Sequence, residues 1–270
     1  MAIAALARAS RFEESGEFSS EDYLRAAVKA WKHLKAHGNE YLDNGRENII
    51  DVYCALMAAA ELFKSTEESV YLEAARNRAV QLYELYDWEA GYWLVEKGSV
   101  RPYFHAAEAG LPIIALTEYL KIEKSGAQKE NIKNTVTLIR TAVMDILQVT
   151  NENPKGNPFA LARQWTKPVD GEIRSSFFIP HTNETGYWWQ GENAKLASLS
   201  CAARRTAMYF AVEPDMQSRI EEFADAQLHW ILGRNPYDTC MLQGHGRNNP
   251  RYEEHYPNAP GGICNGITGG

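Results

Sequence analysis

Several features that would assign a protein class directly are missing from this sequence. Lys and Arg form no run or stripe and the formal net charge is −7, so nothing on the chain would attract a phosphate backbone. No stretch of 18 or more residues is apolar enough to predict a membrane-spanning helix. We therefore expect a protein that binds neither nucleic acid nor membrane.

Cysteine is scarce, and its spacing favours neither a metal site nor a disulfide framework. No CxxC pair and no HExxH pattern occurs in the chain, although zinc sites commonly space their ligands in one of these ways. We therefore expect buried or free thiols, no metal and no cofactor. The four cysteines are Cys54, Cys201, Cys240 and Cys264.

A secretory signal peptide is also missing. The first ten residues (MAIAALARAS) lack a basic-then-apolar order and instead resemble the tail of an amphipathic helix. The other end of the sequence, 261–270, is a glycine-rich loop. Both ends therefore look like positions inside a domain at which the sequence has been cut. Because no signal peptide is found, we expect a cytoplasmic location.

The composition is that of an ordinary globular protein. Hydrophobic residues make up 45% of the 270 residues and charged residues 23%, which predicts one sizeable core and a single domain over residues 1–270. Aromatic residues reach 11%, with seven Trp and fourteen Tyr. Such rings line carbohydrate sites but also fill ordinary cores, so composition leaves both uses open.

Helical periodicity runs through most of the chain. Ser19 and Ser20, followed by two acidic residues, predict a helix start, and Gly38 predicts its end. Strand-like alternation is confined to short pieces such as 92–95 and 177–179. Further helices are expected at 47–63, from 69 to about 86, and at 103–120, 130–147, 192–210 and 213–233.

The predicted fold class is all-α. Paired helices of this length fit an open solenoid or a closed toroid of inner and outer helices. A solenoid should repeat its sequence at a fixed period, and no such self-similarity is present. The loops are unequal and rich in Trp, Tyr, His and Gly, which favours a closed barrel whose loops build a site at one end.

The stretch 101–110 (RPYFHAAEAG) is the first candidate for chemistry. His105 and Glu108 stand three residues apart near the start of an expected helix, so they would share one helix face. Two interpretations stay open. The pair caps the first turn of the helix, or His105 donates a hydrogen bond to a sugar hydroxyl.

The stretch 179–193 (IPHTNETGYWWQGEN) concentrates carboxylates, amides and aromatic rings. Trp188 and Trp189 are adjacent, so one is expected to pack inward and the other to line a surface. A sugar offers C–H groups to an aromatic face and hydroxyls to polar side chains such as Glu184 and Glu192. A buried turn with aromatic plugs is the alternative.

Two further stretches follow each other near the C-terminus. Residues 230–236 (WILGRNP) combine a glycine stop with a proline and read as a helix end. Residues 243–250 (QGHGRNNP) alternate glycine with polar residues, which lets backbone approach a ligand closely. His245, Arg247 and His255 offer hydrogen-bond donors without a metal-ligand spacing.

These last motifs resemble glycoside hydrolase family 9. The run 230–246 is similar to the family signature YILGxNPxxxSYVxGxG, and 187–196 is similar to its YxWGSNxxxL, with Trp189 on the family's Trp and Glu192 on its Asn. The order and spacing of the two motifs also fit. The forms PYFHAAEAGLP and PNAPGGICNGITGG look more like the bacterial exo-β-glucosaminidase and cellobiase-like branch than like secreted endocellulases.

The resemblance implies an (α/α)6 barrel, incomplete in this chain, and inverting hydrolysis by two carboxylates. The family's Asp-Ala-Gly-Asp base motif and its acid Glu motif are not found in the sequence, and Glu254-His255-Tyr256 stands where the family has His-His-Arg. The catalytic residues are therefore unknown, with Glu184 and Glu192 the only local substitutes. More plausible roles for these two are contacts to the hydroxyls or the amino group of a gluco- or glucosamine-oligosaccharide.

Three functions are compatible with these patterns. The first is a glycosidase that cleaves β-1,4 bonds, to which this chain contributes the sugar-binding wall and in which this segment alone is inactive. The second is a non-catalytic carbohydrate-binding relative. The third is a helical scaffold whose aromatic loops bind another protein. Tight binding of a protein partner, with no effect of Trp189→Ala on sugar affinity, would support the third.

Overall fold

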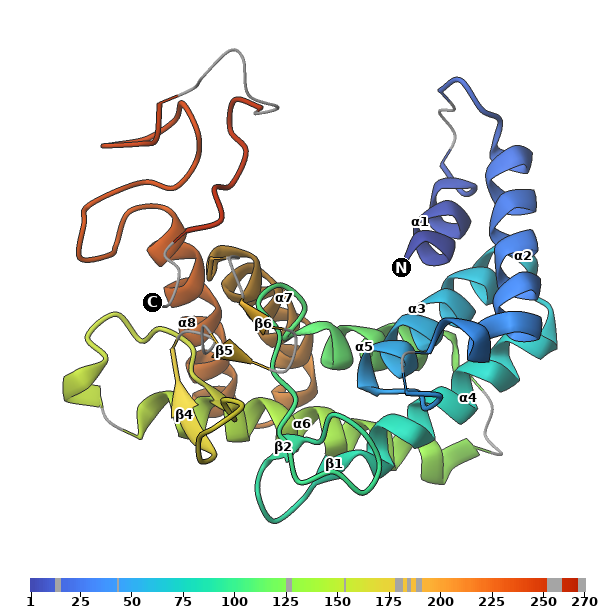
Figure 1. The fold of residues 1–270 in the computed structure, drawn as a ribbon, viewed down its shortest axis with the longest axis horizontal. Helices are drawn as coiled ribbons and strands as arrows, with labels where there is room; N and C mark the ends of the chain where they lie inside the picture. Colours follow the sequence, from blue (N-terminus) through green and yellow to red (C-terminus); the bar gives the residue numbers. More distant parts are fainter. Residues whose placement is uncertain are drawn as a thin grey trace. The chain divides into compact units, whose positions relative to one another are not determined.

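The structure of the chain, a computed structural model, describes residues 1–12, 16–42, 44–124, 128–152, 154–177, 182–183, 186–187, 191–251 and 259–266. It divides into two compact units. The first unit comprises residues 1–87, 93–99 and 115–139, and the second comprises 88–92, 100–114 and 140–270. Helices α5 (Leu111–Ile122) and α6 (Lys129–Asn151) contribute residues to both units (Figure 1).

Four further helices build the first unit. They are α1 (Ala2–Ala9), α2 (Ser20–His37), α3 (Ile49–Thr66) and α4 (Ser69–Glu84), with the 3₁₀ helix η1 (Gly38–Tyr41) after α2 and the strand β1 (Tyr86–Asp87) after α4. Strand β2 (Tyr92–Trp93) has one residue in each unit. Capping explains where two of them start. Ser19 and Asp22 form a capping box at α2, and Asn48 and Asp51 form one at α3, so orphan backbone amides are satisfied at the start of both helices.

The first unit is held together by apolar packing around α1 and α3. Helix α1 packs against both α2 and α3, and α3 packs against α4. Small residues such as Ala7, Ala27 and Ala58 let the backbones approach, while Leu62 and Tyr71 fill the remaining space. The helix that the sequence suggests at residues 1–10 is therefore present and packs through its apolar face.

A buried charge cluster ties α3 to α1. The Glu61 side chain is 0% exposed, and it accepts hydrogen bonds from Arg8 at 2.8 Å, from Lys64 at 2.9 Å and from Arg11. Burial alone would raise the pKa of Glu61, but the hydrogen bonds from Arg8, Lys64 and Arg11 outweigh it and lower the pKa to about 2. The Glu61 carboxylate is thus charged at neutral pH, and its negative charge is balanced by the neighbouring cations Arg8, Arg11 and Lys64.

The second unit contains the remaining elements. They are the 3₁₀ helix η3 (Pro154–Gly156), β3 (Gln164–Thr166), β4 (Arg174–Ser176), β5 (Thr182–Asn183), β6 (Gly186–Tyr187), α7 (Asn193–Ala207), the 3₁₀ helix η4 (Met208–Phe210) and α8 (Pro214–Ile231). Strands β3 and β4 pair antiparallel with Trp165 opposite Ser175, and β5 pairs antiparallel with β6.

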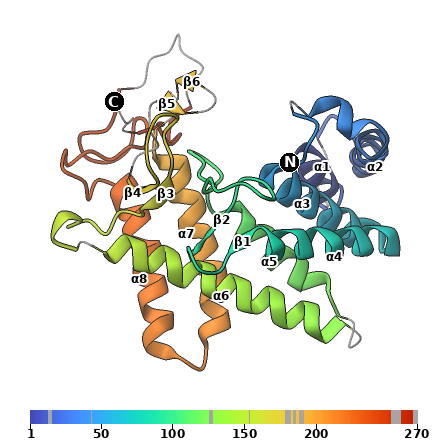
Figure 2. The same cartoon turned by 60° about the horizontal axis from the view of Figure 1, so that its bottom comes forward.

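Helices α7 and α8 form the core of the second unit. They lie side by side (Figure 2) and are the most extensively packed pair of helices in it. Leu196, Leu199, Phe210, Ile220 and Trp230 are among the buried residues between and around them. Because only a short connection through η4 separates the two helices, the start of α7 and the end of α8 lie at the same end of the pair.

Most helices lie where the sequence predicts them, but one predicted helix begins later in the structure than expected. The helix expected at 103–120 begins only at Leu111, and 106–110 forms turns. The His105 ring accepts hydrogen bonds from the backbone amides of Ala107 and Glu108, which competes with helical hydrogen bonding there. His105 and Glu108 therefore do not share a helix face. No helix in the described part of the chain is long and apolar enough to cross a membrane.

We predict that the free energy of unfolding falls as the pH is lowered because of Glu61. Its folded pKa of about 2 lies below the ordinary value of 4.5, so its charge stabilises the fold above about pH 4.5 and this stability is lost progressively towards pH 2. The loss should be on the order of 2–3 kcal/mol. Glu61→Gln should lower stability at pH 7 and flatten this dependence in urea unfolding between pH 3 and 7.

Glu21→Gln, at the exposed start of α2, is the matched control and should leave the pH dependence unchanged. Parallel curves for the wild type and Glu61→Gln across this range would contradict the prediction.

Candidate functional site

The end of α8 is shaped by one buried asparagine. Asn235 donates from Nδ2 to the carbonyl oxygens of Trp230 and Thr239, both at 2.8 Å, and its Oδ1 accepts from the amides of Tyr237 and Thr239. Gly233 has a φ of +119°, a conformation that favours glycine. The Gly-x-Asn-Pro sequence therefore turns the chain sharply after the helix, as its helix-end pattern predicts.

Residues 259–266, here called the C-terminal strap, pair with the segment that follows this turn. Gln243 donates its amide to the Gly262 carbonyl at 2.9 Å, and Gly261 donates to the Gln243 carbonyl at 2.7 Å. The amide of Cys264 donates to the Met241 carbonyl at 2.9 Å. These backbone hydrogen bonds fix the strap beside the glycine-punctuated turn at 243–250.

The same strap contacts the start of α7. The amide of Asn193 donates to the Asn265 carbonyl at 3.1 Å, and its Nδ2 donates to the Cys264 carbonyl at 2.7 Å. A Cβ added at Gly191 would lie 2.1 Å from the oxygen of Asn265, so only glycine fits there. The turn before α7 and the turn after α8 therefore meet through the strap at one end of the helix pair.

A buried ion pair lies at the base of this junction. Glu192 is 2% exposed and Lys195 is 0% exposed, and the Lys195 ammonium pairs with the Glu192 carboxylate and donates to the carbonyl of Phe177. Burial lowers the pKa of Lys195, and the charge of Glu192 opposes this shift. Phe177 comes just before the stretch 179–193 and Glu192 lies near its end, so Lys195 connects the two ends of this stretch.

Lys195 is not among the site residues that the sequence predicts. The available signal was its position three residues after Glu192 at a helix start, a spacing that brings the two side chains together. The sequence predicts that Glu192 contacts a sugar, and that role stays a prediction. The structure adds that its carboxylate is buried and held by a lysine.

His105 is held in one tautomer. Its Nδ1 accepts from the amides of Ala107 at 3.0 Å and Glu108 at 2.9 Å, so the ring hydrogen resides on Nε2. Burial lowers the pKa of His105, with the charge of Glu108 opposing the shift. His105 alone therefore caps a turn that lies before α5, and the pair does not cap the first turn of a helix as the capping interpretation has it.

The His105 turn is fastened to α7. The amide of Gly110 donates to the Ser198 hydroxyl at 3.1 Å, and a Cβ at Gly110 would lie 2.2 Å from the Ser198 carbonyl oxygen. The turn and the helix thus approach backbone to backbone, which requires glycine. This contact places the 101–110 stretch against the helix that begins directly after Glu192.

His245 and Arg247 lie on the exposed glycine turn. Gly244 and Gly246 have φ angles of +73° and +80°, and the intervening side chains are exposed to solvent. Arg247 pairs with Asp238 at 2.7 Å. Both donors are accessible to a ligand. The other predicted site residues, Glu184, Trp188, Trp189 and His255, lie outside the described residues.

The family model for glycosyl hydrolase family 9 matches residues 1–261. The chain belongs to this family. Among curated proteins, none matches it. A solved structure titled "Bacteroides ovatus GH9" is 17% identical with a TM-score of 0.57, and the match covers 98% of this chain and 44% of that chain.

A metagenome-derived family 9 endoglucanase is 18% identical with a TM-score of 0.55, and that match covers 93% of this chain and 39% of the other. The likeness shows that this family 9 chain has the helical (α/α)6 fold, of which it holds part. The chain spans less than half the length of these two solved structures.

We predict that Lys195→Met destabilises the protein by roughly 3–5 kcal/mol, because it leaves the buried Glu192 carboxylate without this cation. The double variant Lys195→Met with Glu192→Leu should recover most of the loss, since neither charge is then buried. Guanidinium unfolding of the variants measures both effects.

Arg204→Met, also on α7, is the matched control for Lys195→Met. Arg204 pairs with Asp225 where both side chains are about half exposed, so its loss should cost less than about 1 kcal/mol. Equal losses for the two single variants would contradict the special role of the buried pair.

We also predict that Gly191→Ala lowers the thermal midpoint by several degrees, because its Cβ would overlap the backbone of the strap. Gly38→Ala is the control, since Gly38 has a helical φ of −53° and open space around its Cβ position. That control should be neutral or stabilise slightly. Equal midpoints for both variants would show that the strap does not hold this turn.

Proposed function

We propose that this chain forms the sugar-binding wall of a glycoside hydrolase that cleaves β-1,4 bonds in short gluco- or glucosamine-oligosaccharides. The observation that carries the proposal is the junction of two turns through the C-terminal strap at Gly191 and Asn193. In the sequence, Trp188 and Trp189 stand directly before Gly191 at this junction. His245 and Arg247 belong to the glycine-punctuated turn at 243–250, which lies beside the strap. Aromatic faces and polar donors together suit a pyranose ring.

His105 supports the same assignment. Its Nδ1 is used by the backbone, so its Nε2–H is a neutral donor of fixed direction. A neutral imidazole suits a sugar hydroxyl, which carries no charge to pair with a cation. Glu184 and His255 are proposed as further polar contacts, with an amino group of the sugar as the partner of the Glu184 carboxylate. Glu192, which the sequence also predicts as a contact, is buried and paired with Lys195, so we propose that it supports the wall from beneath.

The proposed mechanism is inverting. One carboxylic acid donates a proton to the leaving glycosidic oxygen, and a second carboxylate takes a proton from the water that attacks the opposite face of the sugar. The two groups must be about 6.5–9.5 Å apart to admit this water. The family's base and acid motifs are absent from the 270 residues, so we assign both groups to the rest of the protein and binding to this chain.

The decisive test follows the anomeric configuration of the product. The complete protein should hydrolyse cello- or glucosamine-oligosaccharides and release the α-anomer first, as seen by proton NMR within the first minutes. Release of the β-anomer would reject inversion. Sugar binding without hydrolysis would favour the non-catalytic relative. Tight binding of a protein partner, together with no effect of Trp189→Ala on sugar affinity, would favour the scaffold.

We predict that the 270-residue segment alone has negligible hydrolase activity, because loss of a general acid or base typically costs about 10²–10⁴-fold each. The assay is reducing-sugar release from the same oligosaccharides. Robust turnover that Glu184→Gln abolishes would place the catalysis in this chain instead.

We predict that His105→Asn separates the capping role from the binding role. The Asn oxygen can still accept from the turn's amides, so stability should stay within about 0.5 kcal/mol. The shorter side chain loses the Nε2–H donor, so oligosaccharide affinity should fall about tenfold. Calorimetric titration of an oligosaccharide measures this, and unchanged affinity would remove His105 from the sugar site.

A further inference from the structure

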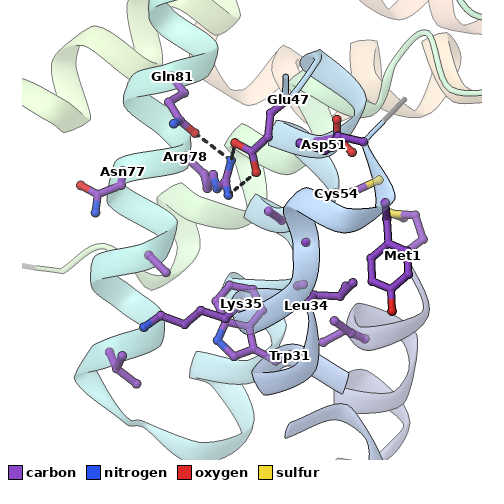
Figure 3. Close-up of a pocket in the computed structure, with 18 of the residues that line it drawn as sticks. Met1, Trp31, Leu34, Lys35, Glu47, Asp51, Cys54, Asn77, Arg78 and Gln81 are labelled. Atoms are coloured by element: carbon purple, nitrogen blue, oxygen red, sulfur yellow. Dashed lines mark hydrogen bonds and ion pairs between the residues drawn. The ribbon is translucent and has the colours of Figure 1, made fainter. Parts of the chain in front are cut away.

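The first unit contains a cavity that the proposed function does not use. Its volume is about 570 Å³, within the range of small-molecule sites. Helices α2, α3 and α4 form its walls, with residues of α1 and η1 at its edge. Figure 3 shows side chains from these helices around the cavity.

One end of the cavity is aromatic and apolar. Trp31 and Leu34 line it from α2, and Tyr41 lines it from η1. Trp31 is held edge-on against Tyr71, with ring centroids 5.8 Å apart at 75°. Tyr41 is 60% exposed, so its ring is accessible. Lys35, four residues after Trp31, shares its helix face.

The other end is polar and preorganised. Arg78 donates to both carboxylate oxygens of Glu47, at 2.5 and 2.8 Å, and to the Gln81 side chain at 3.1 Å. Asp51 and Asn77 line the same cavity, and Figure 3 shows Arg78 and Glu47 away from the Trp31 end. Amide, carboxylate and guanidinium groups offer hydrogen-bond donors and acceptors side by side, so they can bind adjacent hydroxyls of a sugar.

The charge of the lining argues against an anionic ligand. Two cationic side chains and three anionic ones line the cavity, and Arg78 is neutralised by Glu47. A phosphate or nucleotide would find no uncompensated cationic cluster among these lining residues. A neutral ligand with an apolar face and a hydroxylated edge fits both ends.

We propose that this cavity is a second carbohydrate-binding site, which takes one or two pyranose units of an oligosaccharide. Trp31 and Tyr41 provide the apolar contact, and Lys35, Asn77 and the Glu47–Arg78 pair hydrogen-bond the hydroxyls. The choice of sugar as ligand rests on the proposed function, because the same oligosaccharide supplies both sites.

The test uses fluorine NMR of the complete protein labelled with 5-fluorotryptophan. Each Trp signal is assigned by a Trp→Phe variant, and cellopentaose or a glucosamine pentamer is titrated. The Trp31 signal should shift with a saturable dependence near the millimolar range, whereas Trp88, which is exposed and lies outside the cavity, should not shift. A Trp31 signal that stays fixed with both sugars would overturn the proposal.

Matched variants locate the effect. Lys35→Ala and Tyr41→Ala should each weaken the binding reported by Trp31 at least about threefold, whereas Lys32→Ala, an exposed position on the same helix that does not line the cavity, should leave it unchanged. Binding that neither cavity variant weakens, or a Trp31 shift produced by inorganic phosphate and not by sugar, would also overturn the assignment.

The same spectra keep the two proposals apart. Trp188 and Trp189 report the proposed sugar-binding wall, and Trp31 reports the cavity. A Trp31 shift without a Trp188 or Trp189 shift supports the cavity and counts against the wall. Shifts of Trp188 and Trp189 alone support the wall and reject the cavity.

Discussion

The candidate site depends on a backbone-to-backbone contact between the start of α7 and the C-terminal strap. Gly191 leaves no room for a side chain against Asn265, and Asn193 binds the strap through both its amide and its side chain. Because the strap also pairs with residues 241–243, it couples two loops that are far apart in the sequence. Among the described residues, Asn193 also donates from Nδ2 to the Met241 sulfur at 3.0 Å, so the strap and this direct contact together join the two turns.

Buried charge plays two different parts in the two units. In the first unit, Glu61 is surrounded by three cations, Arg8, Arg11 and Lys64, so the carboxylate acts as a crosslink between α3 and the N-terminal segment. In the second unit, Glu192 and Lys195 bind each other, and Lys195 also binds a backbone carbonyl. Such a pair adds little net stability over apolar residues, but the loss of one partner leaves the other as an uncompensated buried charge.

Histidine at position 105 has a structural role in the turn before α5. Capping uses one ring nitrogen and thereby fixes the hydrogen on the other. The contact of His105 with a sugar hydroxyl stays a prediction. The capping also explains why the helix expected at 103 begins at Leu111, since local side-chain hydrogen bonds compete with helical ones.

The sequence by itself determined the helical class, most helix positions and the family, because apolar periodicity, caps such as Ser19 and motifs such as the Gly-x-Asn-Pro turn are local patterns. Only the tertiary structure decided that the Glu192–Lys195 pair is buried and binds the Phe177 carbonyl, that Asn193 joins the strap, and that Trp31 and Arg78 line one cavity. Burial and long-range pairing arise when separate elements pack, and no local pattern encodes which side chains will then meet.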